Sequence, residues 1–254
     1  MVRFLPFLYY CFFAITLTLS LSCQAANDKW VTDAHATFYG DMKGGETMYG
    51  ACGYKDLYTQ GYGLETAALS TALFNNGSAC GSCYEIQCIN SKWCKPNKNT
   101  IKITATNFCP PNYTKTVDIW CNPPQKHFDL SLKMFLTIAE YKAGIVPVRF
   151  RRVPCVRKGG LKFLLQGNQG WYLVLVFNVG GVGNVVDVKI KPSNSRIWMQ
   201  MTRNWGQNWQ FTRNLIGQSL SFQVTTSDGK MVQSDNVVPA NWQFGQTFEG
   251  SKNF

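Results

Sequence analysis

Acidic residues and histidines are scarce in this chain. Its 254 residues include 14 Asp and Glu and 2 His against 25 Lys and Arg, which gives a formal net charge of +11. Reactions that need two carboxylates therefore have few candidate residues. The basic residues form no run longer than Arg151-Arg152 or Arg157-Lys158, so nucleic acid is not an expected partner. A basic chain outside the cell would instead adhere to acidic polymers such as pectin.

Long apolar runs are also missing beyond the N-terminus. The nearest approach, from Leu173 to Val182, is interrupted by an asparagine and several glycines. The one long run, Phe4 to about Leu21, follows Arg3 and precedes the small residues Ala25 and Ala26. This pattern predicts a secretory signal peptide over residues 1–25. A membrane anchor is the alternative because the run is nearly long enough to span a bilayer, but no basic stop-transfer cluster follows it.

Cysteine is absent after residue 155. Of the ten cysteines, Cys11 and Cys23 leave with the signal peptide, and an even set in an exported chain predicts disulfides. A zinc site is the alternative for the Cys-x-x-Cys pair, but no second pair occurs at matching spacing, and we expect neither metal nor cofactor. The abrupt end of the cysteines predicts two domains, residues 26–156 and 157–254. The eight remaining cysteines are Cys52, Cys80, Cys83, Cys88, Cys94, Cys109, Cys121 and Cys155.

The first domain consists of short strand-like runs separated by Gly, Asn and Pro. Examples are residues 36–39 and 101–106, and such runs predict a compact β-rich barrel. We expect one helix, over Leu130 to Ala143, capped by Asp129 and ended by Gly144. A strand from Val146 to Val153 follows it.

The second domain follows a short polar hinge at residues 157–160. Regularly spaced short strands with Gly, Asn, Pro and Asp turn signals predict an all-β sandwich. The expected strands are residues 161–165, 171–179, 185–190, 198–201, 219–225 and 231–233.

The tightest cluster of reactive groups is His127-Phe128-Asp129. A carboxylate held in a cleft beside an imidazole can donate a proton if its pKa is raised. The plainer interpretation makes Asp129 a helix cap and His127 a packed polar residue. An inverting glycosidase would also need a second carboxylate roughly 6.5–9.5 Å away, and none stands out among Asp33, Asp41, Asp56 and Asp118.

Aromatic and amide side chains are concentrated in the second domain, at Trp171-Tyr172 and over residues 203–210. Flat rings beside amides suit a glucan chain, although strand alternation should bury one ring of each pair, Trp171 or Tyr172 and Trp205 or Trp209. We assign Trp198 and Trp242 to the core. Asn76 and Asn112 begin glycosylation sequons.

These segments together resemble the α-expansins of plants along essentially the whole chain. The carriers are AHATFYG at 34–40, GACGY at 50–54, QGYG at 60–63, ALSTALFNNG at 68–77, CGSCYEI at 80–86, TNFCPPN at 106–112, CNPP at 121–124, HFDL at 127–130, AGIVPVRFRRVPC at 143–155, NWGQNWQ at 204–210 and WQFGQTF at 242–248.

The resemblance implies a fold and a role. The fold is mainly β: a six-stranded double-ψ β-barrel similar to family-45 endoglucanases, then an immunoglobulin-like sandwich similar to grass-pollen allergens. The implied role is non-enzymatic loosening of the plant cell wall at acidic pH by a secreted monomer, associated peripherally with the wall. Its partners would be cellulose and matrix glucans such as xyloglucan. The rival hypotheses are an inverting endoglucanase with an unusual base and a wall lectin without mechanical effect.

The resemblance also implies roles for residues. Asp129 matches the proton donor of the related endoglucanases, with His127 beside it, and Thr37 and Tyr39 match cleft residues. Asn107 stands where some relatives have an aspartate, and no counterpart of the hydrolytic base is evident. Trp171, Tyr172 and Trp205 would stack on sugar rings. The implied disulfides are Cys52–Cys80, Cys83–Cys155, Cys88–Cys94 and Cys109–Cys121.

The chain departs from the α-expansin pattern around GACGY. Family members usually have a glycine-rich sequence before this motif and a glycine after it, whereas this chain has Met48-Tyr49 and Lys55. Bulk in place of glycine would narrow or reshape the entrance of the cleft.

Overall fold

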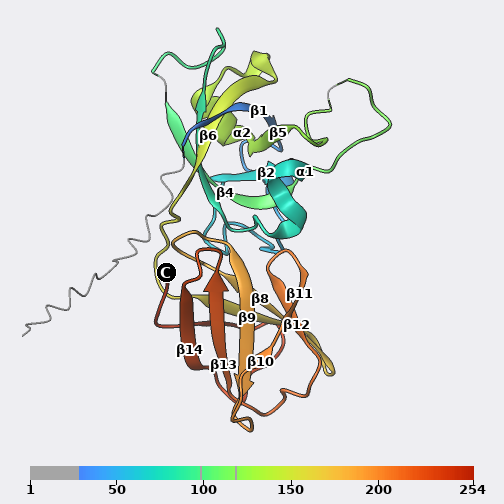
Figure 1. The fold of residues 1–254 in the computed structure, drawn as a ribbon, viewed down its shortest axis with the longest axis vertical. Coiled ribbons are helices and arrows are strands. Elements are labelled where there is room, and N and C mark those ends of the chain that lie inside the picture. Colours follow the sequence, from blue (N-terminus) through green and yellow to red (C-terminus); the bar gives the residue numbers. More distant parts are fainter. Residues whose placement is uncertain (1–28, 98, 118) are drawn as a thin grey trace, which may run out of the picture.

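A computed structural model describes residues 29–97, 99–117 and 119–254. The predicted signal peptide and Asp118 lie outside the described residues. Figure 1 shows two β domains stacked along the long axis, with the N-terminal domain above and the C-terminal domain below. Among the described residues, no helix is both long and apolar enough to cross a membrane.

The N-terminal domain is a closed barrel of six strands, which confirms the predicted double-ψ architecture. The strands follow one another around the barrel in the order β1-β5-β2-β4-β3-β6, with β1 parallel to β5 and β2 parallel to β4. Closure leaves no free sheet edge. The strands are β1 (Val31–Tyr39), β2 (Thr66–Leu69), β3 (Cys83–Cys88), β4 (Thr100–Phe108), β5 (Lys126–Ser131) and β6 (Val146–Val153).

Aromatic rings fill the barrel interior. Phe128 of β5 packs edge-on against Tyr84 of β3 and Phe150 of β6, with ring centroids 5.3 and 4.9 Å away. Because side chains alternate along a strand, the burial of Phe128 and Leu130 inside the barrel turns His127 and Asp129 to the opposite face of β5.

The predicted helix begins later and is shorter than expected. Asp129 is not its cap, because β5 continues to Ser131, whose Oγ accepts the hydrogen bond from the Met134 amide. The helix α2 (Leu132–Ile138) ends where Ala139 adopts an extended conformation and forms a β-bridge with Cys94. In the remainder of the predicted helix, only Tyr141–Ala143 is helical, as a 3₁₀ turn. The other short helical segments are α1 (Thr71–Phe74) and the 3₁₀ turns Gly45–Thr47 and Asn75–Gly77.

Four disulfides close the barrel loops, with the pairing that the resemblance implied. Because Cys80 and Cys83 bond to different partners, neither has a thiolate left for zinc. The bridges are Cys52–Cys80, Cys83–Cys155, Cys88–Cys94 and Cys109–Cys121.

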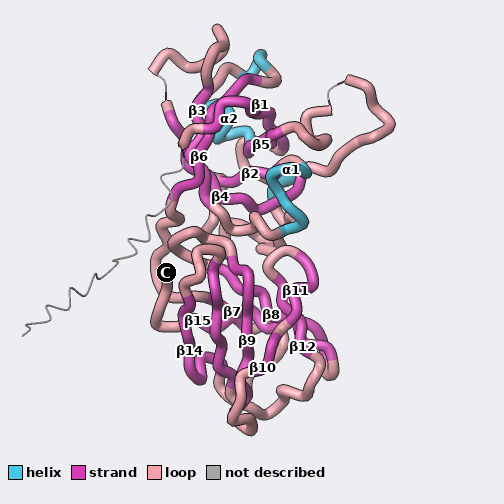
Figure 2. The backbone as a smooth tube through the Cα atoms, in the orientation of Figure 1, coloured by secondary structure: helices cyan, strands magenta, loops and turns pink. Residues whose placement is uncertain are grey.

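The C-terminal domain is the predicted sandwich of two antiparallel sheets, seen as the lower set of strands in Figure 2. One sheet has the order β10-β9-β13-β14 and the other β11-β12-β8-β7-β15. Phe163 and Phe222 stack between them at 4.5 Å. The strands are β7 (Lys162–Asn168), β8 (Trp171–Phe177), β9 (Val185–Pro192), β10 (Met199–Gln200), β11 (Thr202–Trp205), β12 (Asn208–Phe211), β13 (Leu220–Thr226), β14 (Met231–Val238) and β15 (Thr247–Glu249).

The segment between the domains is anchored rather than free to hinge. Arg157 donates from Nη2 to Thr104 Oγ1 at 2.7 Å, and Asn178 donates from Nδ2 to the carbonyls of Lys158 and Gly160 at 2.8 Å. Cys155 donates its amide to Gly181 at 2.6 Å. The linker is therefore bonded to both domains, which fixes their relative orientation.

Candidate functional site

Strand pairing brings five polar residues to one face of the barrel. Thr37 of β1 lies opposite Asp129 of β5, and Ala68 of β2 lies opposite both Asp129 and Asn107 of β4. His127 and Tyr39 are two residues from Asp129 and Thr37 on their strands, so they share that face. We call Thr37, Tyr39, Asn107, His127 and Asp129 the polar row. The small side chain of Ala68 leaves space between Asn107 and Asp129.

The Thr37 hydroxyl links the two reactive side chains. Its Oγ1 donates to Asp129 Oδ1 at 2.7 Å and lies 2.8 Å from His127 Nε2. A hydroxyl has one proton to donate, so an ionised Asp129 requires His127 to carry its proton on Nε2 and donate it to Thr37. His127 Nδ1 is buried and has no hydrogen-bond partner among the described residues. With Asp129 ionised, the imidazole is thus held as the neutral tautomer that carries its proton on Nε2.

Burial shifts the pKa values of the polar row. Desolvation raises the pKa of Asp129, and the Thr37 hydrogen bond opposes that shift in part. Desolvation lowers the pKa of His127 to about 4, with a smaller contribution from His35. The pKa of Tyr39 is raised to about 12, again mainly by desolvation. The row therefore favours uncharged groups, and Asp129 holds a proton at higher pH than an ordinary carboxyl does.

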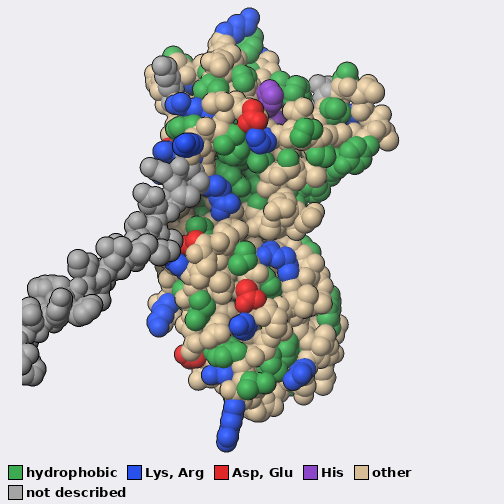
Figure 3. Space-filling view, in the orientation of Figure 1, with side chains coloured by type: hydrophobic (Ala, Val, Ile, Leu, Met, Phe, Trp, Pro, Cys, Tyr) green, Lys and Arg blue, Asp and Glu red, His purple; other side chains and the backbone are tan. Residues whose placement is uncertain are grey.

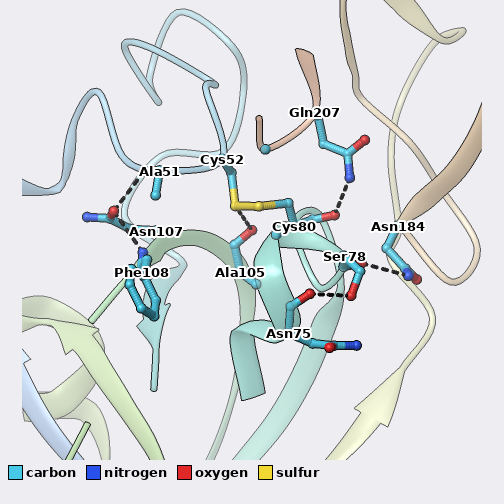
Figure 4. Close-up of a disulfide and its surroundings, with 12 residues drawn as sticks. Ala51, Cys52, Asn75, Ser78, Cys80, Ala105, Asn107, Phe108, Asn184 and Gln207 are labelled. Atoms are coloured by element: carbon cyan, nitrogen blue, oxygen red, sulfur yellow. Dashed lines mark hydrogen bonds between the residues drawn. A yellow bond between two sulfur atoms is a disulfide. The ribbon is translucent and has the colours of Figure 1, made fainter. Parts of the chain in front are cut away.

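Asn107 connects the row to the loop that contains the GACGY motif. Its Oδ1 accepts from the Ala51 amide at 2.8 Å and its Nδ2 donates to the Tyr39 hydroxyl at 3.4 Å. Gly50 lies so close that an added Cβ would come within 2.8 Å of Asn107 Cβ. Figure 4 shows Asn107 beside Ala51, with the Cys52–Cys80 disulfide next to them. This loop is therefore hydrogen-bonded to the polar row and packed against it.

The sandwich presents two exposed tryptophans on one face of its β8 sheet. The exposed fractions of Trp171 and Trp205 are 41% and 48%. Gln210 lies between them, because its Oε1 accepts from Trp171 Nε1 at 3.5 Å and from Asn204 Nδ2 at 2.6 Å. Trp205 opposes Asn208, which opposes Leu175 of β8, so the strand register places these side chains on a common face.

Tyr172 does not belong to this face, which corrects its predicted stacking role. Its exposed fraction is 0%, it lies in the sandwich core, and its hydroxyl donates to Asn214 Oδ1 at 3.0 Å. Alternation along β8 sends Trp171 outward and Tyr172 inward. Trp209 is buried as the partner of exposed Trp205, as expected for one ring of each pair, and Trp242 is buried in the core. Trp198 is not a core residue: it is partly exposed, and Lys191 Nζ lies 4.7 Å from its ring.

The barrel loop and the sandwich face meet at Trp205. A Cβ on Gly53 would come within 3.1 Å of Trp205 Cζ3, so glycine permits this contact. Gln207, two residues on, donates its amide to the Cys52 carbonyl and its Nε2 to the Cys80 carbonyl, both at 3.0 Å. Arg203 supports the turn from beneath by donating to the Gly206 carbonyl at 2.8 Å. The polar row, the GACGY loop and Trp205 therefore form one connected path across both domains.

Comparison with known proteins agrees with this architecture. A family model described as "Expansin C-terminal domain" matches residues 161–239, and one described as "Lytic transglycolase" matches residues 66–150. Expansin-A23 of Arabidopsis thaliana is 60% identical over 235 residues, 92% of this chain and 84% of that relative. Expansin-A32 of Oryza sativa subsp. japonica is 50% identical over 224 residues, 87% of this chain and 83% of that relative. This chain belongs to the expansin family.

A solved expansin shares the two-domain fold. The expansin of Clavibacter michiganensis aligns with a TM-score of 0.66 and 19% identity over 89% of this chain and 98% of that chain. A variant of that bacterial protein has been crystallised in complex with cellohexaose. At this level of identity the likeness shows the fold, and the resemblance to α-expansins rests on the plant relatives.

The three candidate second carboxylates that the structure describes are engaged in separate interactions. Asp33 pairs with Lys126 at 2.8 Å, Asp41 accepts from the amides of Lys43 and Gly45, and Asp56 accepts from the Thr59 amide. Among the residues that the structure describes, no three His, Cys, Asp or Glu side chains gather to hold a metal ion. A cavity of about 260 Å³ does exist, but it is lined by residues such as Tyr62, Lys102 and Arg157, away from the polar row.

Sequence reasoning missed the residues that connect the parts of the site. Ala68, Ala51 and Gly53 carry no reactive group, so composition gives no reason to select them. Ala68 matters because non-local pairing places it between Asn107 and Asp129. Arg203 lay within the aromatic segment that was identified, and its role as a support for the Trp205 turn follows from its bonds to main-chain carbonyls.

Proposed function

We propose that this expansin is secreted into the plant cell wall, binds cellulose together with matrix glucans, and loosens their non-covalent contacts without hydrolysis. Trp171 and Trp205 stack on sugar rings. Thr37, Tyr39, Asn107, His127 and Asp129 hold the chain at the barrel through hydrogen bonds. Xyloglucan is the expected matrix partner, pectin is attracted by the net positive charge of the chain, and the protein acts as a monomer.

The observation that carries this proposal is the connected path from Asp129 to Trp205. Hydrogen bonds and close contacts join the polar row through Ala51 and Gly53 to the tryptophan face. A path that combines hydrogen-bonding groups and flat exposed rings suits an extended glycan. Because the linker is bonded to both domains, their relative orientation is fixed. A glycan held along this path would therefore bind a protein surface of one fixed shape. Binding can thereby favour a separated chain over a packed one.

In the part of the chain that the structure describes, no second carboxylate is paired with Asp129, which supports a non-hydrolytic mechanism. Asn107 occupies the strand position across Ala68 from Asp129, and an amide cannot accept a proton from water as a catalytic base does. Asp33 and Asp41 are exposed, Asp56 is partly exposed, and all three are engaged elsewhere. An inverting hydrolase needs both an acid and a base, so Asp129 alone supports binding and proton donation but leaves attack by water unassisted.

The raised pKa of Asp129 supports activity at acidic pH. As pH falls, this carboxyl takes up a proton sooner than an ordinary aspartate, and a neutral carboxyl can donate as well as accept hydrogen bonds. A sugar hydroxyl is bound at lower desolvation cost by a neutral group than by a buried charge. Binding of a glycan at the polar row would therefore strengthen as the wall is acidified.

Replacement of Asp129 tests the role of the barrel. We expect Asp129→Ala to abolish extension of heat-inactivated wall strips under constant load, because the hydrogen-bonding carboxyl of the row is lost. Cellulose binding, which we assign mainly to the tryptophan face, should fall much less. Asp33→Ala, at an exposed aspartate on the same barrel, is the matched control and should retain extension. Full extension by Asp129→Ala would overturn the role of the row.

The two sequons fit a secreted glycoprotein. Asn76 and Asn112 are both exposed, so each is accessible to glycosylation. Mass spectrometry of the protein from a plant host, before and after removal of N-glycans, measures occupancy at each site.

A further inference from the structure

Two residues beside the GACGY loop have an unusual backbone conformation. Seven non-glycine residues of the described chain have positive φ, and five of them are asparagines, which tolerate this region. The other two are Tyr49, with φ of 57°, and Lys55, with φ of 58°. These are the positions at which the sequence departs from the glycines of the α-expansin pattern. A strained conformation that persists where glycine would be relaxed suggests a function for the side chains.

The two residues face each other at the base of the loop. The Tyr49 amide donates to the Lys55 carbonyl at 2.9 Å and so closes the segment between them. Within that segment, Gly50 packs against Asn107 and Gly53 packs against Trp205. Tyr49 and Lys55 therefore flank the part of the glycan path that joins the barrel to the sandwich.

Neither side chain makes a hydrogen bond, ring contact or ion pair with the described residues that would stabilise the fold. Tyr49 has an exposed fraction of 75%, and within the described residues its side chain makes no hydrogen bond or ring contact. Its neighbour Met48 does the packing instead, because it lies against the barrel core and its Sδ accepts from the Leu57 amide. Lys55 is partly exposed and forms no ion pair with any described residue. An exposed ring and an unpaired ammonium group thus lie next to the path.

We propose that Tyr49 and Lys55 form an additional subsite for a uronic-acid-bearing sugar of a matrix polysaccharide. The Tyr49 ring stacks on the apolar face of the sugar. The Lys55 ammonium group pairs with the uronate carboxylate, as the excess of basic over acidic residues in the chain favours. The subsite rests on the proposed function, because it lies along the same glycan path, and it gives that path a preference for acidic side groups.

The double variant Tyr49→Gly/Lys55→Gly is a direct test, because glycine suits both backbone conformations. Its melting temperature should equal or exceed that of the full-length wild-type protein. The probes are a xylan with glucuronic acid side groups and the same xylan after carboxyl reduction, compared by affinity electrophoresis at low ionic strength. We expect the wild type to prefer the acidic xylan by roughly threefold to fivefold, and the double variant to lose most of that preference, since one partly exposed ion pair contributes about this factor.

A matched control comes from the loop closed by Cys109–Cys121. Tyr113 and Lys115 are an exposed tyrosine and an exposed lysine, so Tyr113→Gly/Lys115→Gly makes the same chemical change outside the segment from Tyr49 to Lys55. Because Tyr49 and Lys55 are unchanged in this variant, it should keep the wild-type preference. A wild type without preference for the acidic xylan, or a double variant that keeps it, would overturn the subsite. Failure of the proposed function is separate, because it would appear as unchanged cellulose binding in Trp205→Ala.

Discussion

At the scale of single residues, burial determines the protonation state of His127. Desolvation lowers its pKa to about 4, whereas an unfolded histidine titrates near 6.5. As pH falls between about 6.5 and 4, the unfolded chain takes up a proton that the folded chain refuses, so His127 makes folding less favourable. Asp129 acts in the opposite direction: its raised pKa adds stability at low pH that is lost as pH rises through the folded value.

A titration of His127 tests this environment. We expect its imidazole NMR signals to titrate near pH 4, and the variant His35→Gln, which leaves one histidine in the chain, assigns them. We also expect His127→Gln to reduce the loss of unfolding free energy between pH 6.5 and 4, by up to about 3 kcal/mol. A titration near pH 6.5 would show that water reaches the polar row and would contradict the buried site.

The reactive residues could be selected from the sequence, but their assembly could not. His127 and Asp129 stood out because a histidine, a carboxylate and an aromatic residue lie together. Their contact with Thr37 depends on β1 pairing in parallel with β5, residues some 90 positions apart in the chain. No local pattern encodes that pairing, and the same holds for Ala68 between Asn107 and Asp129.

At the scale of elements, the region from Leu130 to Ala143 shows where local patterns mislead. Apolar residues at helical spacing predicted one long helix, and an aspartate before them looked like its cap. In the structure, residues 126–131 form strand β5, because Phe128 and Leu130 complete the barrel interior. At the other end, pairing of Ala139 with Cys94 stops the helix. Burial in the barrel outweighs helix propensity, which is a weak preference.

Strand alternation also separates the roles of Trp171 and Tyr172, and two substitutions test the separation. We expect Trp171→Ala to weaken cellulose binding by about 1 kcal/mol, or roughly fivefold, with little change in stability. Tyr172→Ala should instead lower the unfolding free energy by about 3 kcal/mol, because it empties a core position.

Tyr172→Phe is the control for the buried site. It removes the hydrogen bond to Asn214 and should cost about 1 kcal/mol. Denaturant titrations and cellulose pull-downs on the same preparations compare the variants. Weaker binding by Tyr172→Phe at unchanged stability would place the Tyr172 hydroxyl in the binding face and contradict its burial.

At the scale of the whole molecule, the disulfides differ in what they constrain. Cys83–Cys155 joins residues 72 apart and ends where the sandwich begins, whereas Cys88–Cys94 joins residues 6 apart. Constraint of the unfolded chain grows with loop length, so removal of the first should cost about 4 kcal/mol and removal of the second about 2 kcal/mol. Urea unfolding of paired Cys→Ser variants measures both. An equal loss would contradict this loop-length account.

The joining of the two domains was the least predictable feature of the fold. Both architectures followed from the sequence, the first from its resemblance and short strands and the second from its regular turns. The polar hinge at residues 157–160 suggested freedom between them, yet Asn178, Arg157 and Gln207 bond across the junction. On the face drawn in Figure 3, basic side chains lie on both domains and acidic ones are few. The junction depends on amides and glycines, whose partners lie in the other domain.

The function proposed for this expansin is loosening of walls without cleavage of glycans. Its most direct test is creep of heat-inactivated plant wall strips under constant load at about pH 4.5, near the range in which carboxyl groups titrate, with reducing ends assayed in the same bath. We expect extension without new reducing ends, and less extension as pH rises through the raised pKa of Asp129. Reducing ends that increase in proportion to extension would contradict the claim and assign the barrel a hydrolytic role.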